Sequence, residues 1–277
     1  MIVSVSRRCD IPRLNFKWFM ERLDAGFVDA VNPFNANQIR RVPLVPAGTE
    51  QPDGVEAFVF WTRNPRHILA NAEELEKRGF NFYVMVTVTG YPLELEPSMA
   101  KPHKVIASMK NLASKIGSDR VIWRYDPIFI SSITNEEFHR KNFGELAQEL
   151  SGSVRRVIVS LYNEYRGSKQ RIEGLERAGV LQMGQHDAAG LGDLLSDLAE
   201  SARAANMEIQ SCAEEKSFEP YGIRSGACID AELINRLWGL DVKGKDKNQR
   251  PNCLCCQSVD IGSYKMCNSG CVYCYAW

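Results

Sequence analysis

Short apolar runs alternate along this chain with stretches of helical periodicity, and this alternation limits the fold more than any other feature. Apolar runs at residues 57–61 and 82–89 are followed by amphipathic segments at 67–78 and 104–116. Such alternation is typical of βαβ units, which build a parallel sheet. About seven strands are expected before residue 215. The sequence therefore predicts an α/β protein, and this number of strands favours a (β/α) barrel or partial barrel over a small open sheet.

The expected elements lie mostly in the first three quarters of the chain. We expect strands at 2–6, 27–31, 57–61, 82–89, 120–123, 156–161 and 208–211, and helices at 14–25, 67–78, 104–116, 135–150 and 188–206. After residue 214 loops predominate, with one short helix at 230–237 and one further strand at 259–265. We therefore divide the chain into a barrel body, residues 1–214, and a cysteine-rich C-terminal region, residues 215–277, that completes the barrel.

Charge and hydropathy exclude several classes of function. Lys plus Arg and Asp plus Glu are each 34, so the net charge is zero and no global attraction to nucleic acid or an acidic membrane is expected. The apolar run at the N-terminus is too short for the core of a signal peptide, and no window approaches 18 uncharged apolar residues. The expected location is the cytoplasm.

Cysteine is the residue type that indicates most about the chemistry of this protein. The chain has nine cysteines, and six of them fall within residues 253–277. Without a secretion signal, clustered thiols favour metal binding or redox chemistry over structural disulfides. Three of them, Cys267, Cys271 and Cys274, lie within eight residues. Three thiolates at this spacing can ligate three irons of a cubane cluster and leave the fourth iron open, as a catalytic centre requires.

A second set of cysteines could hold a second cluster. The preferred set is Cys212, Cys228, Cys253 and Cys255, which leaves Cys9 and Cys256 outside it. The alternative is that cysteines such as Cys212 and Cys228 are small buried residues, a common role for a free thiol. No HxH or HExxH spacing occurs, so a histidine zinc site is not expected.

Polar residues follow several of the predicted strands. In parallel barrels the carboxyl ends of the strands form the active face, and arginine in three of these turns indicates an anionic group on a substrate or cofactor. The alternative is that these residues are helix caps and loop residues. The candidate catalytic residues are Arg124, Asp126 and Tyr162, and the candidate cofactor-binding residues are Arg7, Arg8, Asp10, Thr62, Asn64 and Tyr273.

The C-terminal string CNSGCVYCYA resembles the CxxxCxxC signature of radical S-adenosylmethionine enzymes. The whole chain also resembles a bacterial family of unknown function whose C-terminal cysteines mimic that signature. The segments that carry this likeness are SRRCDIP, NPFN, VFWTRNP, VIWRYDPI, ACID, KDKNQR and SVDIGSY-x2-C-x3-CVYCYA. They span nearly the full length of the chain.

The resemblance implies a cofactor set and a reaction class. It implies a [4Fe-4S] cluster on Cys267, Cys271 and Cys274, S-adenosylmethionine bound at the open iron, and its reductive cleavage to start radical chemistry on a substrate that the sequence does not identify. It also implies a reductant such as flavodoxin or ferredoxin. In most of these enzymes the motif follows the first barrel strand, so its C-terminal position here implies a circularly permuted barrel. Residues 259–265 would then lie beside residues 1–6, with Arg7 or Arg8 near the carboxylate of S-adenosylmethionine.

Two other functions stay open at this point. The first is a non-catalytic iron–sulfur or zinc-binding protein that transfers electrons or senses redox state. The second is a nucleic-acid substrate, because the YCY string also resembles the DNA-lesion lyase branch of the superfamily. The zero net charge and the lack of an interleaved aromatic and basic run count against nucleic acid. No membrane partner is expected.

Overall fold

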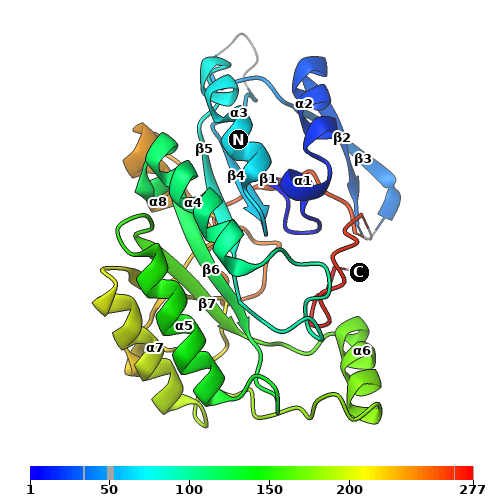
Figure 1. The fold of residues 1–277 in the computed structure, drawn as a ribbon. Helices are drawn as coiled ribbons and strands as arrows, with labels where there is room; N and C mark the ends of the chain where they lie inside the picture. The colour runs from blue at the N-terminus through cyan, green and yellow to red at the C-terminus, as the bar shows by residue number, and fades with distance from the viewer. Residues whose placement is uncertain (34, 49–52, 265, 277) are drawn as a thin grey trace.

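The computed structural model describes residues 1–33, 35–48, 53–264 and 266–276. Within these residues eight parallel strands form one sheet in the order β10–β1–β4–β5–β6–β7–β8–β9 (Figure 1). The strands are β1 (Ile2–Val5), β4 (Ala57–Thr62), β5 (Phe82–Thr87), β6 (Val121–Ile128), β7 (Arg156–Leu161), β8 (Glu208–Cys212), β9 (Arg224–Gly226) and β10 (Val259–Asp260). The predicted α/β class with a parallel sheet is confirmed.

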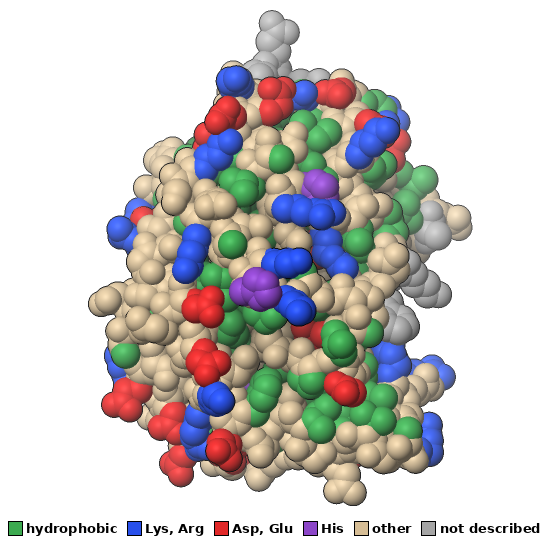
Figure 2. All heavy atoms as spheres, in the orientation of Figure 1, with side chains coloured by type: hydrophobic (Ala, Val, Ile, Leu, Met, Phe, Trp, Pro, Cys, Tyr) green, Lys and Arg blue, Asp and Glu red, His purple; other side chains and the backbone are tan. Residues whose placement is uncertain are grey.

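Eight α-helices accompany the strands in the described part of the chain. They are α1 (Ile11–Leu14), α2 (Phe16–Ala25), α3 (Arg66–Lys77), α4 (Pro102–Ile116), α5 (Glu136–Leu150), α6 (Arg166–Arg177), α7 (Gly192–Ala204) and α8 (Ala231–Trp238). In Figure 1 helices α3, α4, α5 and α7 lie over one face of the sheet. Both acidic and basic side chains are visible over this face in Figure 2. In the described residues no helix has the length and apolar character needed to span a membrane.

The two faces of the sheet are buried against different partners. Alternate strand residues such as Phe60 and Val84 pack into the core under the helices. Their neighbours Val59 and Met85 point to the other face and pack with α8 and with several cysteines. Because both faces are covered, the central strands read as continuous apolar runs rather than as alternating ones. The cysteine-rich region thus covers one face of the sheet and also contributes its two outer strands, β9 and β10.

Two predicted helices begin at different residues in the structure. The helix expected at 14–25 divides at Asn15 into α1 and α2, and the Asp10 side chain caps α1 by accepting a hydrogen bond from the Arg13 amide. The helix expected at 188–206 begins only at Gly192, because Asp187 accepts hydrogen bonds from the amides of residues 189 and 190 in a turn. Helix α6 was not expected, since its only buried residues are Ser168 and Ile172 and it lacks an apolar stripe.

The strand expected at 27–31 exists but does not belong to the parallel sheet. Strand β2 (Phe27–Asn32) pairs in antiparallel fashion with β3 (Asn35–Pro43), and the two form a separate ribbon. Counting this run among the parallel strands was wrong. The physical reason is that β3 follows β2 after a short turn at Pro33, too short for the crossover connection that parallel pairing needs.

Of the strand expected at 259–265, the structure describes residues 259–264, since 265 lies outside the described residues. Within 259–264 only the two residues of β10 are strand, so the predicted length was wrong there. Its predicted neighbour is confirmed, because Val259 pairs with Val3 and Asp260 with Ser4 in parallel register. The chain leaves the sheet at Gly262, where a Cβ atom would collide with Ser6 Oγ. The close approach therefore requires glycine at this position.

Asp260 fixes the contact between β10 and the turn after β1. Its carboxylate accepts hydrogen bonds from Ser4 Oγ at 2.8 Å, Ser6 Oγ at 2.5 Å and the amides of Arg7 at 2.7 Å and Gly262 at 3.0 Å. Four donors satisfy this buried carboxylate, as a buried charge requires. The two ends of the chain are thereby held together at one edge of the sheet.

Candidate functional site

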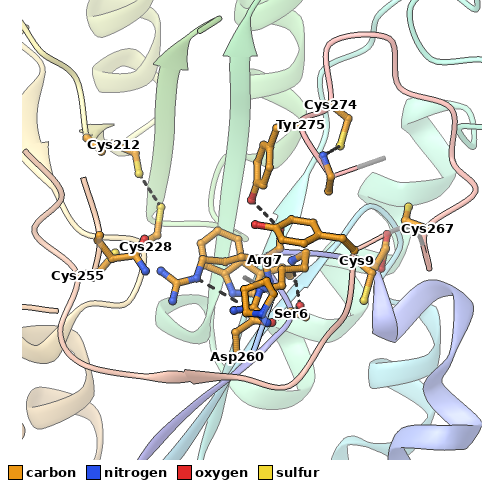
Figure 3. A pocket seen from close by; sticks show the side chains of 18 of the residues that line it. Ser6, Arg7, Cys9, Cys212, Cys228, Cys255, Asp260, Cys267, Cys274 and Tyr275 are labelled. Carbon is orange, nitrogen blue, oxygen red and sulfur yellow. Dashed lines mark hydrogen bonds and ion pairs between the residues drawn. The ribbon is translucent and has the colours of Figure 1, made fainter. Parts of the chain in front are cut away.

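A cavity of about 1070 Å³ opens at the carboxyl ends of the strands. Its lining includes the turn after β1, the ends of β4, β6, β7 and β8, and the loop after β10. All seven cysteines expected to ligate metal line it: Cys212, Cys228, Cys253, Cys255, Cys267, Cys271 and Cys274. Figure 3 shows two groups, with Cys212, Cys228 and Cys255 on one side of Arg7 and Cys267 and Cys274 on the other.

The loop that carries Cys267, Cys271 and Cys274 is held by contacts from several elements. Arg13 donates a hydrogen bond of 2.6 Å to Ser269 Oγ, and the Val272 amide donates one of 3.0 Å to the Leu95 carbonyl. The Arg171 guanidinium donates to the Val272 carbonyl at 2.9 Å and also to the Cys274 carbonyl. This C-terminal segment is therefore fixed to the body by the protein's own side chains.

Two of the three thiols of this loop, those of Cys271 and Cys274, lie in a setting that disfavours free thiolates. Burial raises the pKa of Cys271 to about 11 and also raises the pKa of Cys274. The Cys267 thiol donates to Ser269 Oγ at 3.0 Å, and the Ala276 amide donates to Cys274 Sγ at 3.3 Å. Negative charge on Cys267 would further raise the pKa of Cys271 and Cys274, so the three sulfurs lie close enough to interact electrostatically. A bound cation would offset both the burial and this repulsion.

The three thiols are a donor set of the kind that binds thiophilic metals, although they do not converge in the present side-chain arrangement. Over residues 1–33, 35–48, 53–264 and 266–276, no three His, Cys, Asp or Glu side chains converge on one point as ligands of a metal ion. Cys267 donates instead to Ser269 Oγ, and Cys274 accepts from the Ala276 amide. Soft thiolates select iron–sulfur clusters, zinc and copper(I), so the chemistry of three cysteines on one loop fits the iron–sulfur cluster that the resemblance implies.

A buried network of charged and polar side chains, which the sequence did not predict, contacts this loop through Tyr273. Arg63 forms an ion pair of 2.7 Å with Glu96, and both side chains are largely buried. Tyr273 OH donates to Glu96 and accepts a hydrogen bond of 2.5 Å from Arg63. Burial raises the pKa of Tyr273 well above its ordinary value, so the phenol stays protonated and can donate. Glu96 lies in a loop, and no local pattern links it to a residue 177 positions later.

The second group of cysteines gathers on the other side of the cavity. Cys212 Sγ lies 3.0 Å from Cys228 Sγ. Hydrogen bonds from the thiols of Cys228 and Cys253 lower the pKa of Cys255, which places Cys255 near both of them. The structure thus brings together the four cysteines expected to bind a second cluster.

The two arginines after β1 have different partners. The Arg7 guanidinium donates to Ser258 Oγ at 3.1 Å and lies 3.9 Å from Asp260, and its carbonyl accepts a hydrogen bond of 2.7 Å from Tyr275 OH. Arg8 donates to the Gly262 carbonyl at 3.3 Å and lies over the ring of Tyr264. Both arginines line the cavity. The Arg7 guanidinium is held by an acidic neighbour, whereas the contacts of the Arg8 guanidinium among the described residues are to a carbonyl and a ring.

The candidate catalytic residues also line the cavity. Arg124 forms an ion pair with Asp126 and stacks over Trp61 at 4.7 Å, and Asp126 accepts a hydrogen bond from Ser160. Among the described residues Arg124 Nε and Trp61 Nε1 are buried without a hydrogen-bond partner. Buried donors of this kind are costly unless a ligand supplies an acceptor. Tyr162 bonds to Ser168 Oγ at 2.9 Å.

Three predicted cofactor-binding residues use their polar atoms within the turns. Asp10 accepts hydrogen bonds from the amides of Arg13 at 3.0 Å and Arg63 at 2.8 Å. Thr62 Oγ1 accepts from the Asn64 amide at 3.0 Å and donates to its carbonyl at 3.1 Å. Asp10 and Thr62 line the cavity, and Asn64 lies outside its lining. These contacts are those expected of caps and loop residues.

Cys9 is a further cavity residue that the sequence reasoning left outside both groups. It is buried in the turn after β1, on the same side of Arg7 as Cys267 (Figure 3). Burial raises its pKa to about 11. Its place follows from the close approach of Gly262 to this turn, which no sequence spacing reveals.

Comparisons with known proteins add a family but no reaction. The family described as "Domain of unknown function (DUF1848)" matches residues 2–276. No curated protein matches the chain. Among solved structures, the D-hydantoinase of Bacillus sp. AR9 is similar to 77% of this chain at 9% identity with a TM-score of 0.31, and the chain spans 45% of its length. This last similarity is too weak to support an argument.

Proposed function

Since the chain belongs to the family described as "Domain of unknown function (DUF1848)", we propose its function from the site itself: an enzyme of the radical S-adenosylmethionine type. One observation carries the proposal. The thiols of Cys267, Cys271 and Cys274 line the same cavity of about 1070 Å³ as the polar strand ends. This volume is at the upper end of the range for small-molecule and cofactor sites and would accommodate S-adenosylmethionine together with a substrate.

The three cysteines of the C-terminal loop would hold a [4Fe-4S] cluster. When bound, this cluster would supply the electron for reductive cleavage of S-adenosylmethionine and so begin radical chemistry on the substrate. The contribution of the protein is to hold the loop in place before loading, through Arg13, Arg171 and the Arg63–Glu96–Tyr273 network. Burial of Cys271 and Tyr273 keeps water away from this side of the cavity.

Different polar groups of the chain would contact S-adenosylmethionine and the substrate. Arg8 can offer its guanidinium to a carboxylate, since its described partners are one carbonyl and one ring. Arg124 Nε and Trp61 Nε1 are buried donors in the cavity region, and they suit acceptor oxygens of a substrate. Asp126 holds the Arg124 guanidinium in position. The substrate is therefore proposed to bear an acceptor group such as a carboxylate or phosphate.

The proposal includes a partial (β/α) barrel with a circularly permuted order. Its support is the order of strands in space, which follows the sequence from β1 through β9 in the main sheet except that β10 precedes β1. If β10 replaces the usual first strand, the loop that follows it delivers the three cysteines to the active face.

The test is anaerobic reconstitution with iron and sulfide, followed by reduction in the presence of S-adenosylmethionine. The wild-type chain is expected to bind a cluster and to release 5′-deoxyadenosine, measured by liquid chromatography. Cys271→Ser is expected to abolish release, whereas Cys256→Ser, which changes a buried thiol outside the cavity lining, is expected to retain it. Bound zinc without iron, or a cluster without cleavage, would instead favour a non-catalytic metal protein.

A binding measurement examines the proposed carboxylate contact. Arg8→Ala is expected to weaken S-adenosylmethionine binding about tenfold, the loss of one charge-assisted hydrogen bond. The matched control is Arg177→Ala on the exposed surface of α6, which should leave affinity unchanged. Equal affinity of the Arg8 variant and the wild type in calorimetry would assign the carboxylate to another residue.

A further inference from the structure

The second group of cysteines is assembled from three separate segments. Cys212 ends β8, Cys228 precedes α8, and Cys253 and Cys255 lie in the loop before β10. Cys212 Sγ lies 3.0 Å from Cys228 Sγ, and the thiols of Cys228 and Cys253 both lower the pKa of Cys255, so these thiols interact. We call these four residues the cysteine quartet. Four thiols meeting from three segments are more than the packing of single small residues requires.

Cys256 provides an internal comparison. At 1% exposure it is as buried as Cys228, Cys253 and Cys255, and it also packs on the same face of the sheet. It does not line the cavity, whereas all four quartet cysteines do. Cys256 therefore behaves as a small apolar core residue, and the quartet differs from it by facing an open space together.

The backbone around the quartet is fixed by its own hydrogen bonds. The Cys256 amide donates to the Ile229 carbonyl at 3.0 Å, and the Asp246 amide donates to the Cys255 carbonyl at 2.9 Å. The Ile229 amide donates to Cys255 Sγ at 3.3 Å. Amide donors to sulfur are one means by which proteins stabilise metal-bound thiolates. The frame is rigid enough to present the thiols without a disulfide, and all four are free cysteines.

Positive charge surrounds the quartet. Arg124 acts electrostatically on Cys212 and Cys228, Arg250 acts on Cys212, and Arg7 acts on Cys255. A metal centre with four thiolate ligands carries a net negative charge, and these guanidinium groups would offset part of it, although Arg124 and Arg7 also pair with Asp126 and Asp260.

We infer that Cys212, Cys228, Cys253 and Cys255 form a second, four-thiolate metal site, independent of the cluster proposed for the C-terminal loop. In the structure Cys212 and Cys228 hydrogen-bond to each other, and metal binding would replace the thiol protons. Four thiolates suit either zinc or the four irons of an iron–sulfur cluster. The site would tie the segments around α8 to the end of β8, on the face of the sheet opposite the main helical layer.

The experiment separates this site from the proposed catalytic cluster. Iron, zinc and acid-labile sulfide are measured per chain in a background in which Cys267, Cys271 and Cys274 are all replaced by alanine. This background is expected to retain one metal centre, either about four irons with sulfide or one zinc. Adding Cys212→Ser or Cys255→Ser is expected to remove it, and adding Cys256→Ser is expected to leave it in place.

A second measurement does not depend on the triple variant folding. In the otherwise wild-type chain, Cys255→Ser should lower metal content by one centre, while Cys271→Ser should remove a different one. Absence of metal from the folded triple variant would overturn the inference. So would a Cys212–Cys228 disulfide in the metal-free protein after anaerobic purification, or equal metal loss in the Cys256 and Cys255 variants.

Discussion

At the scale of single residues, nine chemically identical thiols fall into distinct environments. Cys267, Cys271 and Cys274 share one anchored loop, and the quartet of Cys212, Cys228, Cys253 and Cys255 is assembled across the cavity. Cys9 lies in the turn after β1, and Cys256 belongs to the core. The first group also has its own charged neighbours, since Arg63 and Glu96 form a buried ion pair next to its loop. The chemistry of each thiol is thus set by neighbours that its own sequence position does not reveal.

The Arg63–Glu96 pair leads to a prediction at this scale. Glu96→Gln leaves a buried guanidinium without its counter-charge, so we expect a loss of about 3 kcal/mol in the free energy of unfolding. Glu136→Gln, which removes an exposed partner of Arg140, should cost less than about 1 kcal/mol. Urea denaturation of both variants measures the difference. Similar losses would mean that the buried pair is not an important source of stability.

At the scale of elements, the cavity depends on short segments more than on long ones. Strand β10 has two residues, yet its pairing with β1 determines where the cysteine loop begins. The loop then turns at Gly270, which has a φ of +74°. A Cβ atom there would lie 3.0 Å from Pro97 Cγ, in the segment that also supplies Glu96. A small change in this turn would therefore displace both the thiols and their supporting network.

Gly270→Ala tests that dependence. The variant must place alanine in the left-handed region, which costs about 1 kcal/mol, and must also move Pro97. Gly152→Ala is the matched control, since its φ is +77° and nothing lies within 4 Å of the added atom. We expect Gly270→Ala to lose more unfolding free energy and to retain less iron after reconstitution than the control. Equal behaviour of the two would show that the turn tolerates displacement.

At the scale of the whole molecule, one sheet separates a helical layer from a cysteine-rich layer. The helices bury the larger aromatic core, which includes Phe58, Phe60 and Trp123. The opposite face is covered by α8 and the segments around it, and Arg156 links β7 to the N-cap of α8 through Asp230 at 2.6 Å. Because the first and last strands are neighbours, the cavity is complete only after both ends of the chain have joined the sheet.

Buried His139 makes the stability of this assembly pH-dependent. Its ring lies between Tyr125 OH at 2.8 Å and the Phe129 carbonyl at 3.1 Å, and burial lowers its pKa to about 4. An unfolded histidine has a pKa of about 6.5, so the unfolded state binds the proton first as the pH falls. The stability contributed by neutral His139 is therefore present above pH 6.5 and is lost as the pH falls towards 4.

The expected size of this effect is about 3 kcal/mol between those pH values. His139→Gln should be destabilised at pH 7 through altered packing and hydrogen bonding, but it should show a flatter decline on acidification. Burial raises the pKa of Glu214 to about 7, and this group acts in the opposite sense, losing stability as the pH rises. Denaturation of the wild type and of His139→Gln at several pH values measures how the unfolding free energy of each protein changes with pH. Parallel curves for the two proteins would exclude the role of His139.

The sequence alone determined the α/β class, most of the central strands and the three cysteines of the C-terminal loop. Those features are local, because an apolar run or a CxxxCxxC spacing is complete within a few residues. The tertiary structure decided that β2 and β3 form a separate ribbon, that Glu96 pairs with Arg63 beneath Tyr273, and that four cysteines from three segments meet at one wall. Such contacts join residues far apart in the chain, and packing of the whole sheet rather than any local pattern brings them together.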